Sequence, residues 1–86
     1  MKLYETAYTA AGGLAPIKIR GRTYNAYTAD LVSADPSQIR EVYRKRSGEY
    51  FLHLMVPGIG HYIAPLTEAE AAMIEALNQA GGEEAE

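Results

Sequence analysis

Histidines His53 and His61 are the two side chains of this sequence with an ordinary pKa near neutral pH. Each belongs to an apolar stretch with strand character, and a short glycine-containing turn joins the two stretches. Their rings could therefore face each other across a hairpin, as a proton relay or as half of a metal site. A third ligand is missing at metal-binding spacing, and Glu49 is the acid closest in sequence. We expect no metal and no cofactor, a structural role for His53, and an exposed ring for His61.

Other patterns that carry chemistry are missing from the sequence. The chain has no cysteine, which excludes disulfides, thiolate zinc sites and cysteine nucleophiles. It has no Gly-x-Ser-x-Gly motif for a serine nucleophile. Its glycines at 12–13 and at 58 and 60 are not followed by the Lys-Ser/Thr pair of a nucleotide-binding loop. The sequence predicts no catalytic residues and a protein that is not an enzyme.

Two short basic segments, residues 18–22 and residues 44–46, could bind the phosphate backbone of a nucleic acid. Several tyrosines nearby could stack on its bases. The simpler interpretation is that these cations protect the edge of a sheet from aggregation. The formal net charge is −3, and residues 47–86 contain seven acidic residues but no lysine or arginine. We therefore expect nucleic-acid binding to be at most weak.

These side chains must be positioned by strands. Alternation and residue composition predict strands over 2–9, 17–20, 23–29, 50–56 and 61–64. Gly21 supplies the positive φ of a tight hairpin turn, so 17–20 and 23–29 should pair antiparallel. The stretch 50–56 is apolar on both faces, which predicts a place in the middle of the sheet. Pro65 is expected to close the last strand.

Residues 35–46 allow two interpretations. Asp35 as the N-cap, followed by a proline, could start a helix over 36–46. Alternatively, residues 35–38 form a turn and 39–46 form a strand. We favour the turn and strand, because the strong strand at 50–56 needs an antiparallel neighbour beside it in sequence.

The clearest single element is a C-terminal helix. Thr67 as N-cap and Glu70 three residues later form a capping box, and Gly81-Gly82 are expected to end the helix. The apolar stripe expected to face the sheet consists of Ala69, Met73, Ala76, Leu77 and Ala80, with Ile74 at its border. Residues 81–86 are expected to form a flexible acidic tail.

The chain has 86 residues, of which 48% are hydrophobic, and this length suits one domain. The predicted fold class is α+β: an antiparallel sheet of four to six strands, with one C-terminal helix packed on a face, over residues 1–80. The start of the chain has no leader-like apolar segment, and no stretch approaches the roughly 18 apolar residues that span a bilayer. We expect a cytoplasmic protein that does not contact membranes.

Residues 43–72 resemble a pattern in small bacterial and phage-borne proteins. The pattern consists of Tyr43, the segment Ser47-Gly48-Glu49-Tyr50-Phe51-Leu52-His53, and the segment Pro65-Leu66-Thr67-Glu68-Ala69-Glu70-Ala71. The overall format is similar to phage anti-CRISPR proteins: one acidic domain with no catalytic set, no cysteine and several tyrosines among mixed charges. This resemblance implies a non-enzymatic inhibitor that binds a CRISPR effector complex in the host bacterial cytosol.

An enzymatic alternative comes from residues 42–50, which resemble the basic sheet of small ribonuclease toxins of the RelE/ParE type. For the protein-binding interpretation, the contacts should come from arginine and tyrosine, which carry most interface energy. The predicted partner-binding residues are Arg44, Arg46, Tyr43, Tyr24 and Tyr27. A partner with a lysine-lined groove would instead meet Glu68, Glu75 and the acidic tail. The sequence leaves this choice and the oligomeric state open.

Overall fold

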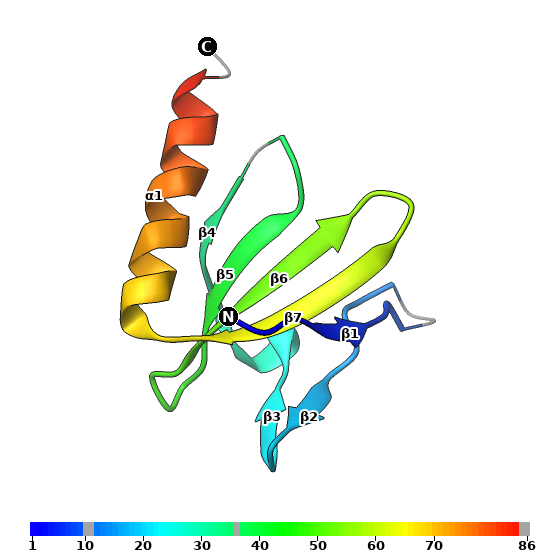
Figure 1. Ribbon diagram of the computed structural model, residues 1–86. Coiled ribbons are helices and arrows are strands. Elements are labelled where there is room, and N and C mark those ends of the chain that lie inside the picture. Colours follow the sequence, from blue (N-terminus) through cyan, green and yellow to red (C-terminus); the bar gives the residue numbers. More distant parts are fainter. Residues whose placement is uncertain (10–11, 36, 85–86) are drawn as a thin grey trace.

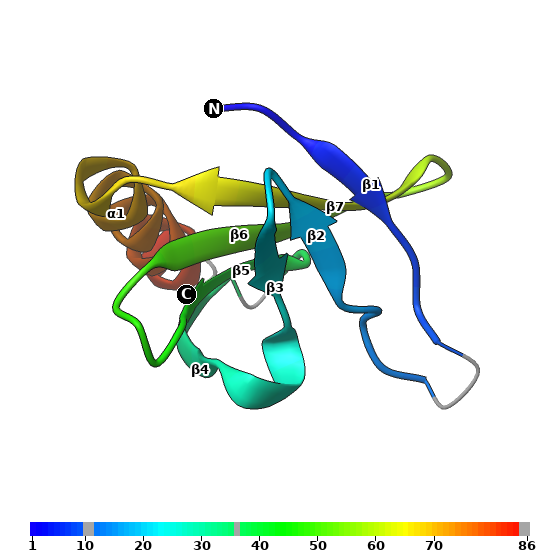
Figure 2. The same cartoon turned by 90° about the horizontal axis from the view of Figure 1, so that it is seen from below.

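A five-stranded antiparallel sheet forms the middle layer of the fold, between a C-terminal helix and a small β-hairpin (Figure 1). The computed structural model describes residues 1–9, 12–35 and 37–84. Figure 2 shows the same molecule from below, with the hairpin in front of the sheet. The predicted α+β class, with an antiparallel sheet and one C-terminal helix packed on it, is confirmed.

The large sheet has the order β1-β7-β6-β5-β4, and every neighbouring pair is antiparallel. Its strands are β1 (Tyr4–Thr6), β4 (Asp30–Ala34), β5 (Arg40–Arg44), β6 (Tyr50–Val56) and β7 (Gly60–Leu66). The separate hairpin consists of β2 (Ile17–Ile19) and β3 (Arg22–Tyr24). A short 3₁₀ helix (Ala26–Thr28) and α1 (Glu68–Glu84) complete the structure.

Strand β6 lies at the centre of the sheet, as its two apolar faces predicted. Phe51 faces the β2–β3 hairpin and packs with Leu14, Ile19, Tyr24 and Ile63. On the other face, Leu52 packs with residues of α1 and neighbouring strands, namely Val42, Ala64, Ala71 and Ile74. One strand therefore supplies both hydrophobic cores, because successive side chains of a strand point to opposite faces.

The turn and strand interpretation of residues 35–46 is confirmed, and the helical alternative is wrong. Strand β5 (Arg40–Arg44) pairs along its whole length with β6. The predicted strand over 23–29, however, ends at Tyr24. The Asn25 side chain accepts a hydrogen bond from the Tyr27 backbone N–H (2.9 Å), which caps the 3₁₀ helix and turns the chain away from the hairpin.

Two strand boundaries and one additional strand also differ from the prediction. The strand expected over 2–9 is limited to β1, with an isolated bridge between Tyr8 and Leu14. Strand β4 was not predicted, because its exposed Leu31 and Val32 break the alternation that marks a half-buried strand. Strand β7 extends through Pro65, because β1 pairs only with residues 61–63 and leaves that part of β7 on an open edge, where proline is tolerated.

The helix starts as predicted. The Thr67 backbone N–H donates to Glu70 Oε1 (2.9 Å), and the Glu70 N–H donates to Thr67 Oγ1 (3.1 Å), which is a complete capping box. The predicted end at Gly81-Gly82 is wrong, since α1 extends to Glu84. Glycine weakens a helix without stopping it. The remainder of the predicted tail, residues 85 and 86, lies outside the described residues.

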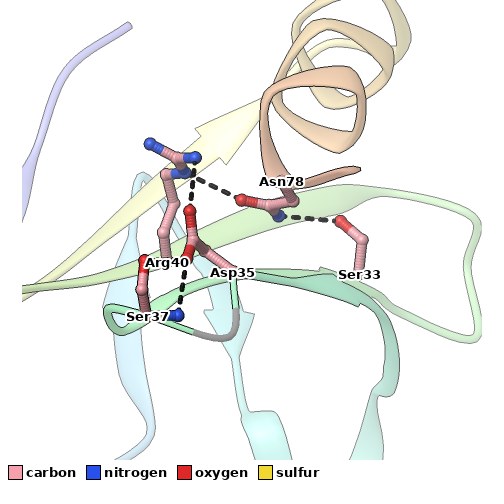
Figure 3. Close-up of polar contacts among 5 residues, drawn as sticks. All are labelled: Ser33, Asp35, Ser37, Arg40 and Asn78. Atoms are coloured by element: carbon pink, nitrogen blue, oxygen red, sulfur yellow. Dashed lines mark hydrogen bonds and ion pairs between the residues drawn. The ribbon is translucent and has the colours of Figure 1, made fainter. Parts of the chain in front are cut away.

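The predicted apolar stripe of α1 is also wrong. Ala71, Ile74 and Asn78 face the sheet, whereas Met73 and Leu77 are 60% and 51% exposed. The buried face contains a polar residue, and its hydrogen bonds explain the orientation. Figure 3 shows Asn78 between Arg40 and Ser33. Arg40 Nε donates to Asn78 Oδ1 (2.8 Å), and Asn78 Nδ2 donates to Ser33 Oγ (3.0 Å).

The same arginine connects the helix to the loop before β5. Arg40 Nη2 donates to Asp35 Oδ2 (3.0 Å), and Asp35 Oδ1 accepts from the Ser37 backbone N–H (2.7 Å). These hydrogen bonds connect α1 to β4 and β5 (Figure 3). Within the described residues, no helix has the length and apolar character needed to cross a membrane.

Replacing Thr67 by alanine is expected to lower the free energy of unfolding by about 1 kcal/mol, because the Glu70 N–H loses its cap. Urea denaturation of the variant and of the parent protein measures this difference. Replacing Thr28 by alanine is the matched control, because Thr28 is an exposed threonine of the 3₁₀ helix whose hydroxyl donates to the Asn25 carbonyl (3.3 Å) and does not cap α1. A Thr67 variant as stable as the Thr28 variant would contradict the role of the cap.

Candidate functional site

The two basic segments of the sequence meet on one side of the molecule. The turn of the β2–β3 hairpin and the turn between β5 and β6 are joined through Glu49, which accepts from Arg22 Nη1 (2.8 Å) and pairs with Lys45 Nζ (3.4 Å). Lys45 Nζ also lies 4.5 Å from the centre of the Tyr24 ring. We call the resulting surface the basic face; its cations are Lys2, Arg20, Arg22, Lys45 and Arg46.

Strand β3 divides the basic face into two hollows. A cleft of about 510 Å³ is lined by Lys2, Tyr4, Ile19, Arg20, Arg22, Tyr24 and Pro65. A second hollow of about 480 Å³ is lined by Thr23, Asn25, Thr28, Lys45, Arg46, Ser47 and Glu49. Both hollows are open and contain more positive than negative side chains, so an anionic surface fits them electrostatically.

The turn that presents Arg20 has an unusual backbone. Arg20 and Gly21 both have positive φ, 53° and 77°, as a two-residue hairpin loop of this kind requires. The prediction for Gly21 is therefore confirmed. Arginine at the first of these positions is sterically less favourable than asparagine or glycine. The hairpin consequently holds an arginine at its tip at some cost to stability.

The structure separates the five residues predicted to contact a partner. Arg46 lies on the basic face. Arg44 is exposed but pairs with Tyr50, which packs toward α1, so Arg44 lies on the opposite side of the sheet. Tyr24 is only 4% exposed and belongs to the core. Tyr27 and Tyr43 line a different, smaller pocket.

The two histidines form a chain with an acid that the sequence reasoning missed. His53 Nε2 lies 3.0 Å from His61 Nδ1, and His53 Nδ1 lies 2.7 Å from Glu41 Oε1. The two rings do face each other, as the hairpin allowed, and a third side chain that the sequence did not indicate, Glu41, lies beside them. Glu41 lies twelve positions before His53 in sequence, and the antiparallel register places the two residues directly opposite each other.

His53 is buried with both ring nitrogens hydrogen-bonded, as a structural histidine requires. His61 is half-buried and lies against Tyr8, with ring centres 4.3 Å apart and ring planes tilted by 31°, so the expectation of an exposed ring is wrong. An ionised Glu41 accepts from the Nδ1–H of His53, which leaves His53 Nε2 to accept from the Nδ1–H of His61.

This chain can orient imidazole rings and hold a proton, but its donors do not converge on one point. Among the residues that the structure describes, no group of three or more histidine, aspartate or glutamate side chains could hold a metal ion. The nearby Tyr43 hydroxyl donates to Glu41 (3.2 Å). Burial, with the Glu41 charge beside it, raises the pKa of Tyr43 to about 12, so this hydroxyl stays protonated at neutral pH.

Acidification is expected to weaken the junction between the two basic turns. Hydrogen bonding from Arg22 lowers the pKa of Glu49 below its ordinary value of 4.5. A carboxyl with a lowered pKa in the folded state stabilises the fold above that ordinary value, and the contribution is lost as the pH falls through the folded value. The stability difference between the parent protein and Glu49→Gln should therefore shrink below about pH 4.5. Urea denaturation across this range measures it; a constant difference would contradict the assignment.

Comparison of the chain with protein-family models, with curated proteins and with solved structures found no significant match.

Proposed function

We propose that this protein acts without catalysis, as an inhibitor that binds a partner protein through the basic face. The observation that carries the proposal is the meeting of two basic segments, far apart in sequence, around the Arg22–Glu49 ion pair. The anti-CRISPR format of the sequence suggests the finer version, in which the partner is a CRISPR effector complex. The expected contact is an acidic surface of that complex.

The charge distribution supports a protein partner over a nucleic acid. Helix α1 packs on the sheet face opposite the hairpin, and its described side chains include Glu68, Glu70 and Glu75 but no lysine or arginine. The helix itself is therefore acidic, on the side opposite the basic face. A local acidic patch on a protein can meet the basic face alone, whereas a long polyanion also experiences the repulsion of the acidic helix.

The position of the tyrosines gives a second argument. Single-stranded nucleic acids bind where bases stack on exposed aromatic rings beside cations. On the basic face, the ring of Tyr24 lies in the core and Tyr4 is half-buried. Lys2 lies over the Tyr4 ring, 5.3 Å from its centre. These rings support the cations and leave little aromatic surface for a base.

The ribonuclease alternative requires basic side chains next to the histidines, and the structure does not place them together in the described residues. Cleavage of RNA needs a general base and cations around the same phosphate. The pocket beside the histidine chain is lined by Tyr8, Gly12, Gly13, Leu14, Ala26, Tyr27, Glu41, Tyr43 and His53, with no lysine or arginine among these described residues. We expect the purified protein to leave RNA intact; cleavage that is lost in His61→Asn would favour the toxin alternative.

Charge reversal on the basic face is expected to remove binding. In Arg20→Glu/Arg46→Glu, two exposed cations of the basic face become anions, and the affinity for the partner should fall at least about 100-fold. The assay uses purified CRISPR effector complexes that bind a target nucleic acid. It measures how strongly the parent protein and the variant, at equal concentrations, inhibit that binding. Thermal unfolding verifies that the variant is folded.

Arg44→Glu is the control, because it makes one charge reversal of the same kind on the opposite side of the sheet, to be compared with Arg20→Glu and Arg46→Glu made singly. It should inhibit as well as the parent protein. Loss of inhibition in Arg44→Glu alone would place the contact near α1 instead. If the parent protein inhibits none of the effector complexes, the finer version of the proposal is wrong.

A further inference from the structure

A separate pocket on the hairpin side of the sheet has the chemistry of a cation site. It has a volume of about 270 Å³, and three tyrosines and one carboxylate line it: Tyr8, Tyr27, Tyr43 and Glu41. None of its lining residues belongs to the basic face. We propose that this pocket binds an alkylammonium group, either a lysine side chain, free or methylated, or a small quaternary ammonium compound.

The aromatic rings are the first argument. Faces of aromatic rings attract cations, and sites that recognise alkylated ammonium groups surround them with several such rings. Tyr27 is 62% exposed and Tyr8 is 48% exposed, so both rings retain accessible surface. In a protein with no tryptophan, three tyrosines at one small pocket are a substantial part of the aromatic side chains.

Each of the three rings lies against a neighbouring ring or against the backbone of Gly13. Tyr43 stacks on the buried Phe51 ring (5.2 Å between centres, 13° between planes), and Tyr8 lies against the tilted ring of His61 (4.3 Å between centres). Tyr27 lies so closely against Gly13 that a Cβ at position 13 would overlap the tyrosine hydroxyl. A site that is already ordered loses less conformational entropy when a ligand binds.

The carboxylate is the second argument. Glu41 is partly buried, and the hydrogen bonds that the described residues make to it, from His53 Nδ1 and the Tyr43 hydroxyl, end on Oε1. Oε2 therefore retains its acceptor capacity for a ligand. An ammonium group beside it would gain charge attraction in addition to the contact with the rings.

The size of the pocket is the third argument. Pockets for drug-sized molecules usually have volumes of about 300–1,000 Å³, and this one is slightly smaller. It therefore suits a side-chain-sized group. The proposal does not depend on the basic face, so either one can fail while the other holds.

The test is an NMR titration of the full chain with tetramethylammonium, with N-acetyl-lysine amide, with its ε-trimethyl form, and with 3,3-dimethylbutanol as a neutral group of similar shape. We expect shifts at Tyr8, Tyr27, Tyr43 and Glu41 with a dissociation constant of about 1 mM for the best cation. The neutral compound should bind at least about tenfold more weakly. Tighter binding of a lysine derivative than of tetramethylammonium identifies a side-chain ligand, and the reverse order identifies a small ammonium compound.

Three variants and one control separate the contribution of the Glu41 charge from that of the Tyr27 ring. Glu41→Gln keeps an acceptor for His53 while removing the charge, and should weaken cation binding about tenfold. Tyr27→Leu removes an exposed ring, and Gly13→Ala displaces that ring without changing it, so both should weaken binding. Glu68→Gln changes the same charge on exposed helix surface and should have no effect. Equal binding of the neutral compound, or full binding by Glu41→Gln and Gly13→Ala, would overturn the proposal.

Discussion

Replacing Phe51 by alanine is expected to lower the free energy of unfolding by about 4 kcal/mol and the melting temperature by about 20 °C. Phe51 is completely buried, stacks on Tyr43 and meets the edge of Tyr24 at 5.6 Å between ring centres. Its ring packs the β2–β3 hairpin against the sheet, at the centre of the core that also contains Ile19 and Ile63. A domain of this size has a total stability of about 4–13 kcal/mol, so the loss is a large fraction of it.

Thermal unfolding followed by circular dichroism measures the effect. Ile59→Ala is the control, since Ile59 is also a large apolar residue but is 72% exposed in the turn between β6 and β7. That variant should melt within a few degrees of the parent protein. A Phe51 variant that unfolds at the temperature of the Ile59 variant would mean that the hairpin is held by other contacts.

Replacing Asn78 by alanine is expected to cost about 2 kcal/mol and to lower the melting temperature by about 10 °C. The substitution removes the acceptor of Arg40 Nε and the donor to Ser33, two bonds that connect α1 to β4 and β5. The arginine then keeps its ion pair with Asp35 but has a partly buried N–H without its partner. Leaving a buried donor without a partner lowers the free energy of unfolding by more than the net contribution of the hydrogen bond itself.

Gln79→Ala is the matched control, because Gln79 is the exposed amide next along the same helix. Its loss should change the melting temperature by no more than a few degrees. Combining Asn78→Ala with Ser33→Ala tests the connection itself: the two losses should be less than additive, because both remove the same hydrogen bond. Full additivity would show that Asn78 and Ser33 stabilise the fold separately.

The elements predicted correctly from the sequence are those with strong local signals. The apolar run at 50–56 could only be a central strand, and the capping box at Thr67 specifies a helix start through side chains three residues apart. The turn at Gly21 likewise depends on positive φ at two adjacent residues, Arg20 and Gly21. Each of these signals lies within a few residues of the element that it determines, so neighbouring residues suffice to find it.

The features that were missed depend on contacts between distant segments. Glu41 meets His53 only through the register of β5 and β6, which a search for the acid nearest in sequence does not consider. The face of α1 is selected by hydrogen bonds from Asn78 to residues about forty positions away. Tyr24 was expected at the surface, but the hairpin folds over the sheet and buries it. Strand alternation predicts none of these outcomes.

The order of the strands has a consequence for how the chain folds. Strands β4, β5 and β6 each pair with the next strand in sequence, whereas Tyr4 of β1 pairs with Ile63 of β7. During synthesis from the N-terminus, β1 is made first but has no partner until β7 has formed. Closing this long loop costs entropy, so contacts between nearby strands form more readily. The meander from β4 to β7 can therefore assemble first, and β1 then docks as the last strand onto an edge of β7 that stays open until it arrives.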